Sequence, residues 1–221
     1  MRGPAHAGLE DRVGFAITVP DSWFEVDLAP TTRDDSLRVL VEERVRGHQE
    51  MWEARHGITR ILREEAARAW DSGAAYAACL AQPTDDGPIT ASLAVSLVRG
   101  PVGARDSQHL LARLRAVAPT EDGRFTTVTT ASLGGVECAR ASGVDDLPVA
   151  GGYVRTVFMQ TFVPVPGANK YFVVSAGSPV VPLAAELHDL FDAITGTFRV
   201  VGSPRATASA PARAPARRTR R

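Results

Sequence analysis

The sequence predicts an α+β domain built on a mainly antiparallel β-sheet that is flanked by helices. Within 151–200, two apolar, aromatic-rich runs flank a Pro-Gly loop at 164–169, which is the pattern of a long-loop β-hairpin. A helix with one apolar stripe is then expected from Ser178-Pro179 to Gly196. Neither piece is stable alone, so we expect the hairpin and the helix to pack together. The residues that we expect to be buried together are Phe158, Phe162, Phe172, Val174, Leu187 and Phe191.

The remaining elements are expected in the order strand, long helical region, two strands, short helix and two strands, before the hairpin and closing helix. We predict strands at 13–20, 74–82, 89–99, 125–132 and 136–142, helices at 31–70 and 107–117, and a closing segment at 198–201. Turns or loops are expected at 83–88, at Gly134-Gly135 and at 145–152. The 31–70 region is either two consecutive helices or one long helix bent at Gly57, with Thr32 or Asp34 as its N-cap.

Length and composition are those of one folded domain with a basic tail. The chain has 221 residues, of which 44% are hydrophobic and 23% charged, which is ordinary for a globular protein. Removing the six arginines after Gly202 from the 25 basic residues leaves 19 against 25 acidic residues, a net charge of −6. We therefore expect an N-terminal extension at 1–12, a single domain at 13–201 and a disordered tail at 202–221.

The tail is rich in Ala, Pro and Arg and has no large apolar residue with which to offset its ordering entropy. Its candidate anion-binding residues are Arg205, Arg213, Arg217, Arg218, Arg220 and Arg221. Because no aromatic side chain can stack on bases, these residues predict weak, non-specific and salt-dependent contact with a polyanion.

The cysteines and the absence of export signals predict a cytoplasmic protein. No stretch reads as a signal peptide, and no run is long enough to span a bilayer, so we expect no membrane insertion. Cys79 and Cys138 each lie in an apolar, strand-like run. We expect both thiols to be free, buried and unreactive, while the sequence leaves open whether the two are adjacent.

No group of residues has the spacing of a known catalytic or metal site. The histidines are scattered, the serines near glycine lack the nucleophile-elbow pattern, and the glycine-rich stretches lack a phosphate-loop lysine. Asp145-Asp146 fits a solvated turn better than an acid–base pair. We therefore expect no enzyme activity, cofactor or metal. Trp52 and Trp70 are candidates for a partner surface, although core packing is the favoured explanation.

Three short motifs resemble the Mog1/PsbP-like families, including their actinobacterial members. They are Phe15-x-Ile-x-Val-Pro-x-x-Trp23, Gly134-Gly-Val-Glu-Cys-Ala-Arg140 and Thr197-Phe-Arg. The resemblance covers about 13–201 and implies an α/β/α sandwich whose first strand ends in Pro-x-x-Trp. The 31–70 region is larger than the resemblance leads us to expect. Relatives are mostly non-enzymatic binding or assembly modules, so the resemblance supplies no catalytic residues.

These observations favour a non-enzymatic protein-interaction or assembly module whose partner is another protein. One alternative is a small-ligand binder or enzyme that uses a pocket between sheet and helices, and another is weak polyanion binding through the tail. A broad apolar surface with a polar rim would indicate the first function. Converging polar groups with perturbed pKa values would indicate the second.

Overall fold

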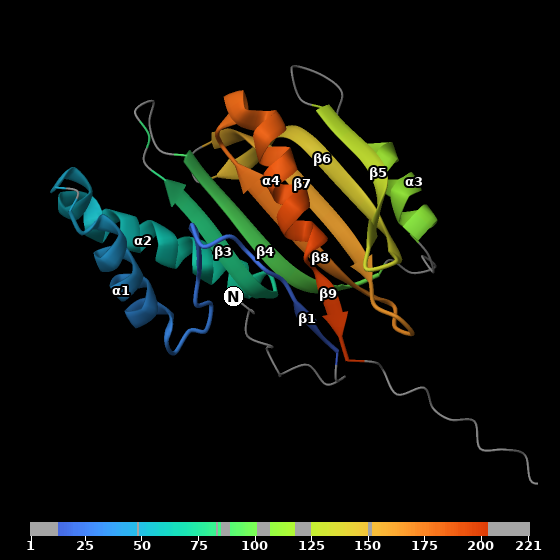
Figure 1. Ribbon diagram of the computed structural model, residues 1–221, viewed down its shortest axis with the longest axis horizontal. Helices are drawn as coiled ribbons and strands as arrows, with labels where there is room; N and C mark the ends of the chain where they lie inside the picture. Colours follow the sequence, from blue (N-terminus) through green and yellow to red (C-terminus); the bar gives the residue numbers. More distant parts are fainter. Residues whose placement is uncertain are drawn as a thin grey trace, which may run out of the picture.

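The computed structural model describes residues 13–47, 49–82, 84, 89–100, 107–117, 125–149 and 152–202. It confirms the predicted α+β architecture, with a seven-stranded antiparallel sheet in the order β2-β3-β4-β8-β7-β6-β5 (Figure 1). The strands of this sheet are β2 (Trp23–Glu25), β3 (Ala74–Gln82), β4 (Ile89–Arg99), β5 (Phe125–Leu133), β6 (Val136–Val149), β7 (Gly152–Pro164) and β8 (Lys170–Ser178).

Helices cover both faces of this sheet. The helices are α1 (Arg33–Val45), α2 (Gln49–Asp71), α3 (Ser107–Val117) and α4 (Ala184–Gly196), with a 3-10 turn, η1 (Val181–Leu183), before α4. The α4 helix crosses one face. The α2 and α3 helices lie toward opposite edges of the sheet, α2 beside β3 and α3 beside β5 (Figure 1). A short antiparallel pair of β1 (Gly14–Ala16) and β9 (Arg199–Val201) closes the fold, so the first strand is shorter than predicted.

The main core lies between the sheet and α4. Phe191 is completely buried there, together with Phe172, Val174 and Leu187, as predicted. Phe158 and Phe162, which were expected in the same core, are only half-buried. Neither belongs to the main core, and Phe162 packs against the residues under α3 instead. Because side chains alternate between the two faces of a strand, Val157 and Met159 of β7 face α4 while Phe158 faces away.

The helical region at 31–70 is two helices, but they do not part at Gly57. The break is at Gly47, whose φ of 91° lies in the left-handed region that favours glycine. Gly57 lies inside α2, so the bend predicted there was wrong. Thr32 occupies the N-cap of α1 without a side-chain hydrogen bond to the helix, and Asp34 lies in the first turn.

The prediction of a loop at 145–152 was also wrong for most of these residues. The β6 strand continues to Val149 and pairs with β7 from Asp145 opposite Thr156 onward. Asp146 forms an ion pair with Arg155 across the ribbon, with Nε–Oδ1 and Nη2–Oδ2 distances of 2.9 and 3.0 Å. This pairing of opposite charges across neighbouring strands stabilises the extension of β6 and β7. The two aspartates taken alone do not predict a strand there. Residues 1–12 and 203–221 lie outside the described residues, so the expected extension and tail stay predictions.

Candidate functional site

A groove with a volume of about 460 Å³ lies on the sheet face opposite α4. Strand register explains its floor, because it aligns small side chains across adjacent strands. One row runs through Ala77, Ala94, Ser175, Gln160 and Ala141, and the next through Cys79, Ser92, Gly177 and Phe158. Most of these side chains are short, so the floor lies low between the elements around it.

Helices α2 and α3 form two sides of this groove, which we call the α2–α3 groove. From α2, Leu62, Ala66 and Ala69 line it at helical spacing, and Leu114 lines it from α3. The exposed Leu147 extends the apolar lining onto the β6–β7 ribbon. The polar lining residues are Glu65, Ser92, Thr126, Asp145, Gln160 and Ser175. Among the residues that the structure describes, none of those lining the groove is basic.

The groove thiol is held in its protonated form. Burial raises the pKa of Cys79 to about 11, and the negative charge of Glu65 acts in the same direction. A thiol with this pKa is almost entirely protonated near neutral pH, and a protonated thiol is a poor nucleophile and metal ligand. Cys79 therefore contributes to the groove as a small apolar residue.

The two cysteines are far apart, which answers the question that the sequence left open. Both are free. Cys138 is completely buried in the core under α4, whereas Cys79 lines the groove on the other face. Their strands, β6 and β3, are four positions apart in the sheet. At about 4.8 Å per interstrand step this separation is far too large for a disulfide.

A second hollow, of about 900 Å³, lies where the start of β3 meets β1, α1 and the end of α2. Four aromatic residues line it, and we call it the aromatic pocket: Phe15, Trp70, Tyr76 and Phe172. The Tyr76 hydroxyl donates a hydrogen bond to Oε1 of Glu25 at 3.4 Å. Burial, reinforced by the charge of Glu25, raises the pKa of Tyr76 far above its usual value, so the phenol stays neutral.

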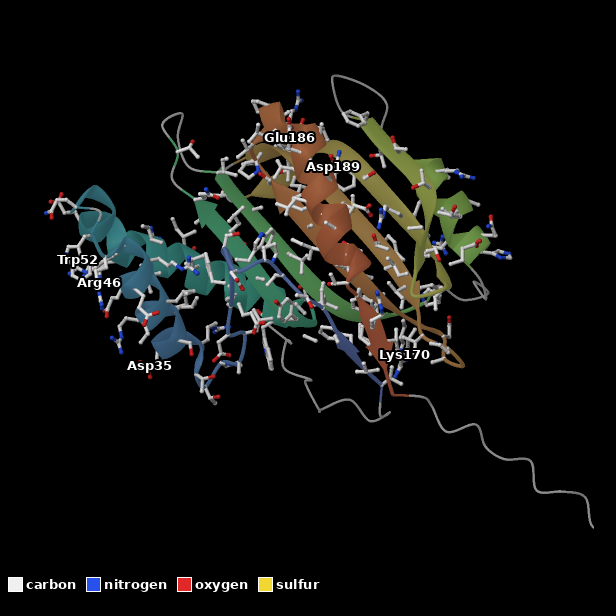
Figure 2. All side chains as sticks on the ribbon, in the orientation of Figure 1. Asp35, Arg46, Trp52, Lys170, Glu186 and Asp189 are labelled. Carbon is white, nitrogen blue, oxygen red and sulfur yellow. The ribbon has the colours of Figure 1, made fainter. Side chains whose placement is uncertain are left out.

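The candidate partner-surface tryptophans are exposed. Trp52 is 39% and Trp70 is 46% exposed, so the core-packing explanation favoured from the sequence was wrong. Trp52 and Arg46 lie at the end of the α1–α2 pair farthest from the sheet (Figure 2). The guanidinium of Arg55 stacks 4.6 Å from the centre of the Trp52 ring. Trp70 lies at the other end of α2 and lines the aromatic pocket.

The other candidates from the sequence do not form a reaction centre. The six tail arginines lie outside the described residues, as do His6 and His48. Asp145 accepts a hydrogen bond from the backbone N–H of Asp146 at 2.8 Å, so both aspartates have structural contacts within β6. Within the described ranges, no three His, Cys, Asp or Glu side chains are grouped so as to hold a metal ion.

Comparison with solved structures finds several chains that are similar to this one, and two of them are known proteins as follows. One is LpqN of Mycobacterium tuberculosis, involved in cell envelope biogenesis, with a TM-score of 0.47 and 15% identity over 91% of each chain. The other is cyanobacterial PsbP (CyanoP) from Synechocystis sp. PCC 6803, with a TM-score of 0.38 and 10% identity, covering 90% of this chain and 98% of CyanoP.

Neither likeness indicates what this chain binds. No model of a known protein family matches the sequence, and no curated protein matches it. No helix in the described part of the chain is long and apolar enough to cross a membrane. The sequence analysis did not predict the groove. Short side chains such as Ala94 and Ser175 can be assigned to one surface only when the strand order is known. Along β4 and β8, short side chains alternate with larger apolar ones, and this alternation was the signal in the sequence that could have indicated the groove floor.

Proposed function

We propose that this chain is a non-enzymatic binding module that holds an apolar segment of a partner protein in the α2–α3 groove. One observation carries the proposal: the groove is open and mainly apolar, its floor is made of short side chains, and polar residues stand among its lining. A broad apolar surface with polar residues at its margin is typical of a protein-interaction site.

The size of the groove fits a segment of polypeptide. From Ala77 on β3 to Ala141 on β6 the floor crosses four interstrand steps, which is about 19 Å at about 4.8 Å per step. An α-helix with its side chains is about 10–12 Å wide. The short side chains of the floor would let large apolar side chains of a partner approach the sheet closely.

The chemistry of the lining supports binding rather than catalysis. Cys79 is the one thiol among the described lining residues, and its raised pKa of about 11 keeps it protonated. Asp145 has its backbone contact to Asp146, and Glu65 forms an ion pair with Arg68 on the surface of α2. Two free thiols on opposite faces of the sheet also fit a reducing compartment such as the cytoplasm.

The alternative is a small-ligand binder or enzyme that uses the same groove, because about 460 Å³ lies within the usual range of small-molecule sites. A photo-crosslinking amino acid separates the two. Placed at Ser92, which is exposed on the floor, p-benzoylphenylalanine should give adducts in the native cell that are larger than the chain by the mass of a protein. The same replacement at Ala193, exposed on α4, is the matched control.

The outcomes of this experiment are distinct. A protein-sized adduct at Ser92 that is absent at Ala193, and that is reduced when Ala94→Leu fills the floor, supports the proposal. An adduct larger by less than about 1 kDa, as a drug-sized ligand would give, indicates a small-ligand site. The same adducts at both positions would contradict a role for the groove.

A further inference from the structure

We propose that two copies of this chain pair along β5, the strand at one edge of the sheet, and so join their sheets into one. This interface is separate from the α2–α3 groove, and the inference does not depend on the function proposed for that groove. It rests on three features of β5: its unpaired backbone groups, its lack of the usual protection of an edge strand, and side chains that match themselves under two-fold symmetry.

The outer side of β5 presents backbone groups that no described residue pairs. The strand is the last of the sheet, and its neighbour in the ladder is β6 alone. In an antiparallel strand, alternate residues direct their N–H and C=O groups to opposite sides, so about half of these groups point away from β6. No other hydrogen bond from the described part of the chain reaches them. A row of free donors and acceptors is the template to which another extended strand adds.

The edge formed by β5 lacks the features that usually protect an edge strand. The strand is nine residues long and pairs with β6 without a register shift from Phe125 to Leu133. None of these residues is charged, and none is proline. Natural proteins shield sheet edges with lysine, proline, bulges or very short strands. The opposite edge follows this rule, because β2 is only three residues long.

The side chains of β5 match those of a second copy in antiparallel pairing about Thr129. With Thr129 on the two-fold axis, Phe125 lies opposite Leu133 and Thr127 opposite Ala131, so every residue keeps its face of the sheet. Apolar ends then meet apolar ends, and the two copies of Thr129 meet at the centre, where a Thr–Thr pair is favourable. The ring of Phe125, which is 47% exposed, gains an apolar neighbour. Since the strand is uncharged, no like charges meet.

The size of the contact sets the expected affinity. At about 3.4 Å per residue the strand pair is about 30 Å long. Helix α3 lies beside β5 and β6, and a two-fold axis normal to the sheet places both copies of α3 on the same face of the joined sheet (Figure 1). A single strand pair is smaller than the interfaces of about 1,200–2,000 Å² that hold stable complexes together. We therefore expect a reversible dimer with a dissociation constant in the micromolar range.

Sedimentation velocity of the full chain tests this proposal. Measured from about 1 to about 100 μM, the chain should shift from monomer to dimer, as a micromolar dissociation constant requires. Thr127→Lys/Thr129→Lys should weaken the dimer by about 3- to 100-fold, because like charges then lie opposite and diagonal to one another across the axis. Both threonines are exposed, so the fold tolerates the change.

Two further samples separate charge repulsion from misfolding. Thr127→Glu/Thr129→Glu should weaken the dimer in the same way, and an equimolar mixture of the lysine and glutamate variants should recover the pairing, since opposite charges then meet. The matched control is Ala185→Lys/Ala193→Lys, which adds the same charge at two exposed positions of α4 and should leave the affinity unchanged.

Three results would overturn the proposal. One is a chain that stays monomeric up to about 100 μM, which would leave an extended segment of another protein as the partner of this edge. The second is a dimer whose affinity is the same in the β5 variants and the α4 control, which would place the interface elsewhere. The third is a mixture of the two charged variants that dimerises no better than either alone.

Discussion

Replacement of Phe191 by alanine should be among the most destabilising single changes in this protein. The side chain has 0% exposure and lies on α4 against the sheet, in contact with the core that contains Phe172 and Leu187. Removing a fully buried ring leaves a cavity that the surrounding residues cannot fill, which costs about 3–5 kcal/mol in unfolding free energy. Since a domain of this kind is stabilised by about 5–15 kcal/mol, that is a large share of the total.

Phe158→Ala is the matched comparison, because the same ring is removed from the other face of the sheet. Phe158 is half-buried and lines the open groove, so its loss leaves no closed cavity. We expect a cost of about 1–2 kcal/mol, in proportion to the smaller apolar area that becomes exposed to water. The two residues share no core cluster, so the double variant should show the sum of the single effects to within about 0.5 kcal/mol.

Equilibrium unfolding in urea measures all three variants. The midpoints should shift while the dependence of free energy on urea stays constant, since each change alters stability and not the surface exposed on unfolding. A loss below about 1 kcal/mol in Phe191→Ala would refute the packing of α4 on the hairpin. A coupling energy above about 1 kcal/mol would mean that the two rings share one core.

Four further predictions concern the groove thiol, the glycines Gly57 and Gly47 of the helical region, and the tail. At pH 8, Cys79 should react with a thiol reagent about 100-fold more slowly than a free cysteine, because burial and Glu65 raise its pKa from about 9 to about 11. Its reactivity should rise as the pH increases toward 11, since only the thiolate reacts. Gly57→Ala should raise stability by about 0.5–1 kcal/mol, because Gly57 is inside α2 and, beyond the neighbouring helix backbone, no described atom lies within 4 Å of the added Cβ. Gly47→Ala should lower stability by about 1–2 kcal/mol, because its φ of 91° strains an L-residue. Deletion of 202–221 should leave the melting temperature unchanged and abolish weak DNA binding at low salt.

Each of these predictions has a contrary outcome. Rapid labelling of Cys79 at neutral pH in the folded protein would reopen a nucleophilic role. Destabilisation by Gly57→Ala would restore the bend that the sequence suggested there. Equal DNA binding with and without the tail, titrated at two salt concentrations, would place the anion site on the body of the protein. A large fall in melting temperature on deletion would show that the tail is docked.

Hydrophobic patterning in the sequence was sufficient for the elements whose stabilising contacts are local or nearly so. The hairpin and the helix that follows it carry buried residues such as Phe172 and Phe191 at the spacing of a strand and a helix, and their mutual packing was predicted correctly. Hairpin turns between neighbouring strands predicted an antiparallel sheet for the same reason. A glycine in a helical pattern can either end the helix or lie inside it. Gly57 was predicted to break the helix, and this was wrong, because a glycine inside a helix lowers its stability by only about 1 kcal/mol.

The composition of each surface was decided by tertiary structure alone. Whether Phe158 faces α4 or the groove depends on the register of a strand, and a shift of one residue reverses it. Ala94, Ser175 and Ala141 lie far apart in the chain and form one floor only because the strand order is β4-β8-β7-β6. Trp70 lines a pocket because the end of α2 meets the start of β3. These contacts join distant segments, and short side chains such as Ala and Ser carry no pattern that would reveal them in the sequence alone.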